Sequence, residues 1–192
     1  MKTSDGGISW RSLNSRTKAW LKSVFFINEL KGFCTGVDWN SFDGVLLSTE
    51  NGGTTWDIRI FDSTYNTYKI NQVFFIDPNI GFLTCYNGKL FKTINGGIDW
   101  EYFDTELSFN FNSICFLDSN TGWIGGWNQS SGGEDNGIIL KTFDGGNNWV
   151  IASYCPYSII SVSFASQSSG YAVGPDGILK TSDGGQTWSS VY

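Results

Sequence analysis

The sequence predicts an all-β protein assembled from one repeated four-stranded sheet, and three observations support this. An eight-residue phrase that ends in tryptophan occurs five times in the 192 residues, at intervals of 39 to 49 residues, which is a period typical of repeat architectures. Between the phrases, short runs rich in Val, Ile, Phe and Thr are bounded by Gly, Asn and Asp, the pattern of antiparallel strands joined by tight turns. No segment keeps a 3.6-residue hydrophobic period long enough for a helix.

The repeated phrase, called the box below, follows the pattern Thr-x-Asp/Asn-Gly-Gly-x-x-Trp. Its copies are Thr3–Trp10, Thr49–Trp56, Thr93–Trp100, Thr142–Trp149 and Thr181–Trp188. A side-chain oxygen that accepts backbone hydrogen bonds, followed by glycines free to adopt positive φ, predicts a hairpin turn with a tryptophan buried beyond it. The box lacks the spaced oxygen ligands and closing Glu of a calcium loop. We therefore assign structural roles to Asp5, Trp10, Asn51, Trp56, Asn95, Trp100, Asp144, Trp149, Asp183 and Trp188.

Each interval between boxes holds the same succession of strands, A to D. Strand A is an apolar run, at 24–27, 73–76, 114–117 and 162–165. Strand B follows a Gly-aromatic pair, strand C leads into the box, and strand D begins at the box tryptophan. The repeats span about 20–64, 69–106, 110–153 and 158–192, whereas residues 1–14 supply strands C and D alone.

Such a sheet cannot bury both faces by itself, but radial stacking of several sheets around an axis buries them against one another. The sequence therefore predicts a single β-propeller domain, with four complete blades, an N-terminal half blade, and strand A innermost. Because the last repeat already has four strands, the half blade has no incomplete sheet to join. We expect the chain to be part of a larger propeller, with terminal sheet faces open to self-association.

The boxes resemble the Asp-box, or bacterial neuraminidase repeat, if Asn51 and Asn95 stand for its Asp. The longer pattern, such as Gly177-Ile-Leu-Lys-Thr181 in strand C, is similar to the subgroup of photosystem II stability and assembly factor repeats. This resemblance implies a propeller, and the subgroup is common in exported bacterial proteins. Asp-box propellers include sialidases, xyloglucan-cleaving hydrolases, sorting receptors and non-catalytic scaffolds, so the resemblance is specific for fold rather than for function.

The composition excludes several kinds of chemistry. There is no histidine, so nucleophile–His pairs and the commonest metal ligand are missing. A net charge of −6 with three arginines, Arg11, Arg16 and Arg59, disfavours nucleic acid, a sialidase site and an arginine-rich patch. We expect no metal, no cofactor and no membrane insertion. The four cysteines are Cys34, Cys85, Cys115 and Cys155. We interpret them as small hydrophobic residues and leave the question of disulfide pairing open. Residues 1–7 show no signal peptide, so the protein is cytosolic or its true beginning is missing.

A partner site is expected where the loops vary. The A-to-B turns are uniform, at 28–31, 77–80, 118–121 and 166–169, whereas the B-to-C loops differ, at 37–43, 86–87, 127–136 and 175–176. Aromatic platforms beside carboxylates suit sugars, peptides or cationic groups. The candidate residues in these loops are Asp38, Trp39, Phe42, Asp43, Tyr86, Trp127, Glu134, Asp135 and Asp176. The alternative is that these aromatics merely cover the sheet ends.

These residues predict a non-catalytic binding or scaffold propeller that engages a protein or carbohydrate partner. The alternative function is a glycoside hydrolase. It would use two carboxylates about 5 to 9 Å apart, drawn from Asp38 or Asp43 with Glu134 or Asp135.

Overall fold

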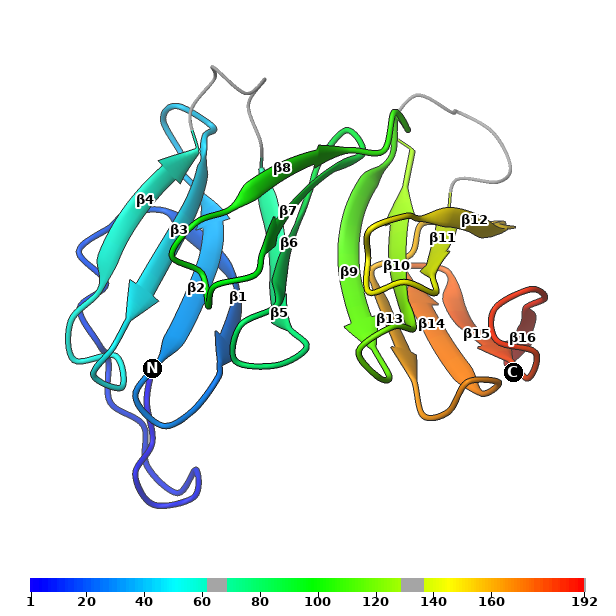
Figure 1. Ribbon diagram of the computed structural model, residues 1–192. Helices are drawn as coiled ribbons and strands as arrows, with labels where there is room; N and C mark the ends of the chain where they lie inside the picture. The colour runs from blue at the N-terminus through cyan, green and yellow to red at the C-terminus, as the bar shows by residue number, and fades with distance from the viewer. Residues whose placement is uncertain (62–68, 129–136, 192) are drawn as a thin grey trace. The chain divides into compact units, whose positions relative to one another are not determined.

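The computed structural model describes residues 1–61, 69–128 and 137–191, and within them the chain forms four antiparallel four-stranded sheets (Figure 1). Blade 1 contains β1 (Trp20–Phe26), β2 (Gly32–Val37), β3 (Gly44–Thr49) and β4 (Asp57–Phe61). Blade 2 contains β5 (Ile70–Phe75), β6 (Gly81–Cys85), β7 (Lys89–Thr93) and β8 (Glu101–Asp104). Blade 3 contains β9 (Asn110–Phe116), β10 (Gly122–Trp127), β11 (Gly137–Thr142) and β12 (Val150–Cys155). Blade 4 contains β13 (Ser161–Phe164), β14 (Gly170–Gly174), β15 (Gly177–Thr181) and β16 (Ser189–Val191).

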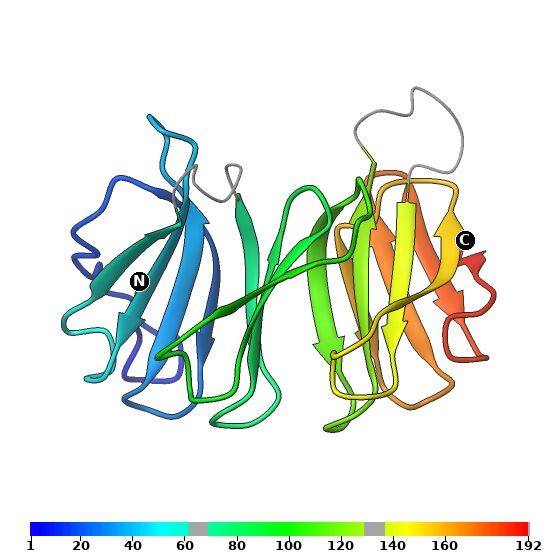
Figure 2. The same cartoon turned by 45° about the horizontal axis from the view of Figure 1, so that its top comes forward.

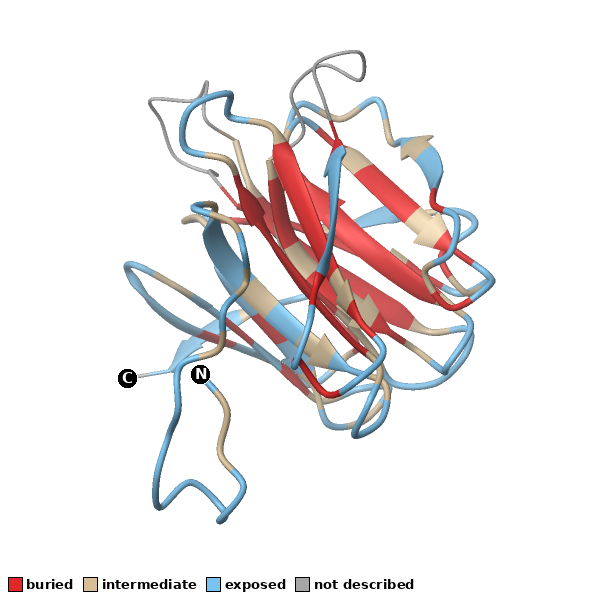
Figure 3. Ribbon diagram, turned by 90° about the vertical axis from the view of Figure 1, so that its left-hand side faces the viewer, coloured by how far each residue is buried: buried red, intermediate tan, exposed pale blue. Residues whose placement is uncertain are grey.

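Each sheet pairs its strands in chain order, so the predicted all-β meander blades are confirmed. Packing divides the chain into two compact units, Met1–Lys69, which holds blade 1, and Ile70–Tyr192, which holds blades 2 to 4. Figure 3 shows burial concentrated in the second and third strands of the blades, as in β10, where residues 122–126 are all buried.

Strand A lies innermost in the second unit, because β9 lies beside both β5 and β13 (Figure 2). Its inner edge has no further strand to pair with, and side chains take over that role. Asn71 Nδ2 donates to the Phe111 carbonyl at 2.9 Å, and Gln72 Oε1 accepts from the Ile114 N–H at 2.7 Å. Asn112 Nδ2 and Ser113 Oγ bridge β9 to blade 4 in the same way. Strand A is therefore not continuously apolar, because its first half carries these bridging residues.

The box closes the C-to-D hairpin as predicted, through the same hydrogen bonds in each copy. In blade 3, Thr142 Oγ1 donates to Asp144 Oδ1 at 2.9 Å and accepts from the Gly146 N–H at 2.9 Å. Asp144 Oδ1 also accepts from the N–H groups of Asn147 and Asn148. Both box glycines have positive φ in all five copies, which is why glycine is required there.

The A-to-B turns and the boxes lie on one face of the blades, as predicted. In each complete blade the N–H of the first box glycine donates to a carbonyl of the A-to-B turn. Gly52 donates to Leu30 at 2.7 Å, and Gly145 donates to Asn120 at 2.9 Å. An Asn, Asp or Ser side chain caps each of these turns, as Asp118 does for Asn120 and Thr121.

The box tryptophans pack mainly on the strand A phenylalanine of their own blade. The ring of Trp149 meets Phe116 edge-on at 5.9 Å and also meets Phe82 of the preceding blade at 6.4 Å. Trp56 and Trp100 are buried, whereas Trp149 and Trp188 are half-buried. Trp10, expected to be buried, is 57% exposed. The half blade forms one bridge, Lys2 to Arg11, and provides no strand A for this ring to cover.

Cys34, Cys85 and Cys155 are buried, and Cys115 is partly buried. Burial raises the pKa of the Cys34 and Cys115 thiols to about 11. They therefore behave as small hydrophobic side chains, as expected.

Candidate functional site

The first candidate loop, residues 38–43, is a tight turn that holds two aromatic rings in solvent. Asp38 Oδ1 accepts hydrogen bonds from the N–H groups of Asn40 at 2.8 Å and Ser41 at 3.1 Å. The bond from the Ser41 N–H has the largest effect, and together the two bonds lower the pKa of the Asp38 carboxyl. The Asp38 and Asp43 main chains pair at 2.9 Å across the base of the turn. The Asp38 carboxylate is thus a turn former, and Trp39 and Phe42 are exposed on the turn.

Trp39 is 64% exposed and Phe42 is 50% exposed. Phe42 takes a positive φ of 61°, a backbone conformation that is uncommon for a bulky side chain. The Phe42 N–H donates to the Asp38 carbonyl at 3.0 Å, so this conformation closes the turn and leaves the ring on its surface.

Strand β1 adds a third aromatic residue that sequence reasoning missed. The rings of Trp20 and Trp39 lie 6.2 Å apart at 52°, and Trp20 is 64% exposed. Lys69 Nζ lies 5.2 Å from the centre of the Phe42 ring. We call Trp20, Trp39 and Phe42 the aromatic cluster. The missed signal was register, because Trp20 pairs with Val37 immediately before the loop.

The remaining described candidates belong to the second unit. Tyr86 and Trp127 are half-buried, and burial raises the pKa of the Tyr86 phenol. Asp176 is exposed. The neighbouring Asn87 N–H donates to Asn110 Oδ1, so the B-to-C loop of blade 2 is attached to strand A of blade 3. Tyr86 and Trp127 thus fit the alternative in which loop aromatics cover sheet ends. Glu134 and Asp135 lie outside the described residues.

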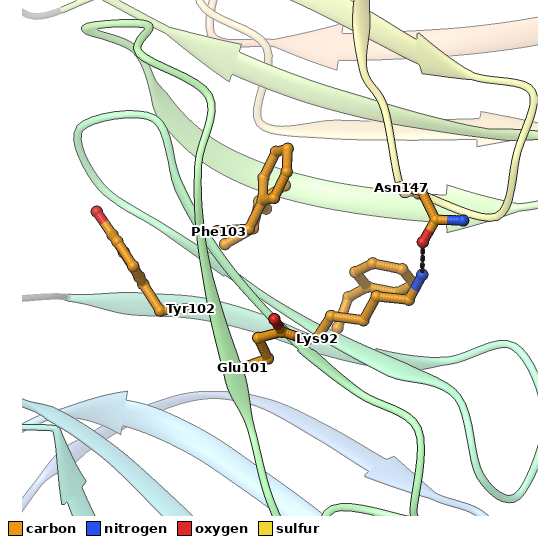
Figure 4. A pocket seen from close by; sticks show the side chains of 8 residues that line it. Lys92, Glu101, Tyr102, Phe103 and Asn147 are labelled. Carbon is orange, nitrogen blue, oxygen red and sulfur yellow. Dashed lines mark hydrogen bonds between the residues drawn. The ribbon is translucent and has the colours of Figure 1, made fainter.

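A small pocket of about 180 Å³ lies between β8 of blade 2 and the box of blade 3 (Figure 4). Lys92 Nζ donates there to the Gly145 carbonyl at 2.9 Å and to Asn147 Oδ1 at 2.6 Å. Burial lowers the pKa of Lys92, although the Asp144 and Glu101 carboxylates oppose this. These hydrogen bonds from the Lys92 ammonium join blade 2 to the box of blade 3. The pocket is therefore a structural feature of the junction between the two blades.

Across residues 1–61, 69–128 and 137–191, no three His, Cys, Asp or Glu side chains gather as metal ligands. None of these residues belongs to a helix long and apolar enough to cross a membrane.

Two photosystem II proteins are similar to the chain in sequence, while no family model matches it. The photosystem II assembly lipoprotein Ycf48 of Synechococcus sp. (strain CC9902) is 30% identical over 129 residues, which cover 62% of this chain and 35% of Ycf48. The chloroplastic photosystem II stability/assembly factor HCF136 of Oryza sativa subsp. japonica is 27% identical over 125 residues, 60% of this chain and 28% of HCF136. The chain thus spans about a third of the length of these relatives.

Solved structures give the same fold. YCF48 bound to a D1 peptide superposes with a TM-score of 0.70 at 22% identity, covering 92% of this chain and 55% of that one. YCF48 from Cyanidioschyzon merolae gives 0.66 at 20% identity, covering 91% and 56%. The GH74 enzyme of Niastella koreensis also gives 0.66, at 18% identity, covering 88% and 30%.

The fold defines the class of this protein as a β-propeller of four-stranded blades. Within that class, the similarity in sequence is to the Ycf48 and HCF136 assembly factors.

Proposed function

We propose that the chain is a non-catalytic binding propeller that engages an extended protein segment through its variable-loop face. The observation that carries the proposal is the aromatic cluster, in which Trp39 and Phe42 are exposed on a turn that Asp38 holds closed and Trp20 of β1 lies beside Trp39. Flat, rigid rings give large contact area at low entropic cost. The similar protein Ycf48, whose solved relative is bound to a D1 peptide, supports a peptide as the ligand class.

A glycan partner, the other expectation, would stack on the same rings. Hydrolysis of that glycan is disfavoured, because the Asp38 carboxylate, next to Trp39 in the chain, is engaged by three donors of its own turn. Sialoside, xyloglucan and aryl-glycoside substrates should show no turnover. Saturable hydrolysis that Asp38→Asn abolishes would overturn the non-catalytic assignment.

The binding test compares two exposed tryptophans. Peptides are selected from a random display library on the wild-type chain, and their affinity is then measured by calorimetry for Trp39→Ala and Trp10→Ala. Trp10 is similarly exposed but is the last residue of the first box, on the face opposite the variable loops. We expect at least about tenfold weaker binding for Trp39→Ala, as at an interface anchor, and unchanged binding for Trp10→Ala. Equal affinity of both variants would show that the face is misplaced.

We further propose export from the cytoplasm, supported by the similarity to a lipoprotein and to a chloroplastic factor. Fractionation of the source cells with an antibody against this chain tests it, and recovery with cytosolic markers would contradict it.

A further inference from the structure

The pocket between β8 and the box of blade 3 has an apolar side as well as the polar side that joins the two blades. Phe82 and Leu90, which are buried, and Phe103, which is half-buried, form this apolar side. Glu101 and Tyr102 also line the pocket and are exposed, so it opens to solvent along β8 (Figure 4).

The next junction, between blades 3 and 4, has the same kinds of partner around a larger ring. Trp123 takes the strand B position that Phe82 has in blade 2, directly after the first glycine of the strand. Its ring stacks on Phe164 with centroids 3.6 Å apart, and its Nε1 donates to the Gly184 carbonyl at 3.0 Å. Lys141 Nζ donates to the same carbonyl at 3.1 Å and lies 5.0 Å from the centre of the Trp123 ring. Trp123 has no exposed surface, so an indole ring fills this junction.

The junction of blades 2 and 3 offers the same surroundings to a smaller ring. Lys92 Nζ donates to the Gly145 carbonyl at 2.9 Å and lies 5.4 Å from the centre of the Phe82 ring. Phe82 stacks on Phe116 with centroids 5.2 Å apart, a wider separation than in the next junction. Because a phenylalanine lacks the second ring and the N–H of an indole, this junction is filled less completely, and the pocket lies beside Phe82.

The volume of the pocket limits what it can hold. Sites for drug-sized molecules have about 300–1,000 Å³, whereas an apolar cavity of about 150 Å³ holds one benzene molecule. At about 180 Å³, the pocket accommodates a single aromatic side chain. The remainder of a ligand has to lie outside the pocket, along the exposed part of β8. The side chain of a second protein meets this condition, because its backbone stays at the surface.

The polar side of the pocket suits an indole ring. An ammonium group has three N–H donors, and the Lys92 ammonium uses two of them on the Gly145 carbonyl and Asn147 Oδ1. A cation beside an aromatic face attracts tryptophan more strongly than tyrosine or phenylalanine. In the next junction, a lysine and an indole N–H share one box carbonyl, that of Gly184.

We propose that the pocket binds the tryptophan side chain of a partner protein, with the indole ring against Phe82 and Leu90 beside the Lys92 ammonium. The partner's ring then completes this junction as Trp123 completes the next one from within the chain. The site lies between two blades and is separate from the aromatic cluster, so it does not depend on the loop-face proposal.

The first test uses N-acetyl-tryptophanamide, which carries the side chain on a short backbone. Nuclear magnetic resonance of the isotope-labelled chain follows the amides of Gly146 and Asn147, which line the pocket. We expect saturable shifts of these amides as the probe is raised to about 10 mM, because one buried ring gives only weak affinity. N-acetyl-leucinamide should bind at least about fivefold more weakly, since it has no ring to face the ammonium.

Three variants test the comparison between the junctions, with circular dichroism to verify folding. Phe82→Trp fills the pocket from within the chain and should abolish the shifts. Tyr171→Trp introduces the same residue at the corresponding position of blade 4, which is exposed, and as the matched control should bind like the wild type. The reciprocal variant, Trp123→Phe, should open a second site, with new shifts of the Gly185 and Gln186 amides.

The proposal fails if the wild type shows no saturable shifts, if a folded Phe82→Trp binds as the wild type does, or if the leucine amide binds as tightly as the tryptophan amide. Tighter binding of free indole than of the tryptophan amide would assign the pocket to a small molecule and overturn the assignment to a partner protein. Trp39→Ala should leave the shifts of Gly146 and Asn147 unchanged, which separates this result from that of the loop-face proposal.

Discussion

At the residue scale, glycine begins strand B in every blade because a phenylalanine ring of strand A lies against it. A Cβ atom built on Gly32, Gly81, Gly122 or Gly170 would lie 2.6 Å from that ring. In the sequence, the glycine and the phenylalanine recur at separate positions of each repeat. Only the strand register, which pairs Gly122 with Phe116, shows that the phenylalanine ring requires a glycine opposite it.

Gly122→Ala should therefore destabilise the protein by about 1–3 kcal/mol, as overpacking of a core does. The Phe116 ring is held between Phe82 and Trp149 and has no room to retreat. Urea unfolding at neutral pH measures the loss, with Ser163→Ala on exposed β13 as the control. Addition of Phe116→Val should recover part of the loss. Equal midpoints for the wild type and Gly122→Ala would refute the ring contact.

The third box residue is hydrogen-bonded to the seventh, which explains why the box of blade 2 carries Asn. Asp144 accepts from Asn148 Nδ2 at 2.8 Å, whereas Asn95 Nδ2 donates to the Asp99 carboxylate at 3.1 Å. Each pair combines one donor with one acceptor. The Asn at position 95 thus meets a local hydrogen-bond requirement set by Asp99.

This pairing predicts opposite pH responses for two variants. Hydrogen bonds from Asn148 lower the pKa of Asp144 to about 2, below its unfolded value of about 3.9. The stabilisation it provides is complete above pH about 4 and is lost as the pH falls toward 2. Asp144→Asn should weaken the acid dependence of the urea midpoint. Asn95→Asp, facing Asp99, should destabilise at pH 7 and recover on acidification, and an unchanged pH profile in both would contradict this assignment.

At the element scale, the sequence predicted the blades well and strand A poorly. The apolar run at 114–117 marks only the end of β9, which begins at Asn110. Polar residues such as Asn112 and Ser113 are absent from an apolar pattern, yet both belong to β9 and bridge to the next blade. A hydrophobic pattern indicates which residues are buried against other side chains. It does not indicate where the backbone groups at the inner edge of a sheet need hydrogen-bond partners.

The box tryptophans differ in what covers them, so their removal should differ as well. Trp100→Ala should cost about 3–5 kcal/mol, the range for a large core truncation, because Trp100 is 8% exposed against Phe75. Trp10→Ala should cost well under 1 kcal/mol, as surface substitutions do. Chemical denaturation of both variants measures the difference. Similar losses would mean that the box acts through its turn alone.

At the scale of the whole molecule, the candidate site was only partly predictable. The loop that carries Trp39 was evident from its variation in length, whereas Trp20 belongs to a strand and joins the site through register. The blade junctions were hidden for a related reason. A lysine before a box reads as a solvated charge, and its acceptor, a backbone carbonyl, leaves no trace in the sequence.

Blade order within the second unit predicts a gradient of local stability. Blade 3 is covered on both sides, and Ile124 and Leu140 in β10 and β11 have no exposed surface. Blade 4 is covered on one side only, with Tyr171 and Ile178 exposed on the other. In a stack whose sheets contact only their neighbours, the end sheet opens first.

Amides of β14 and β15 should therefore exchange with solvent through loss of blade 4 alone, and those of β10 and β11 only when the whole unit opens. Native-state hydrogen exchange followed by mass spectrometry resolves these segments. We expect protection to fall from blade 3 to blade 4. Equal protection across β10, β11, β14 and β15 would instead show that the unit opens as one cooperative body.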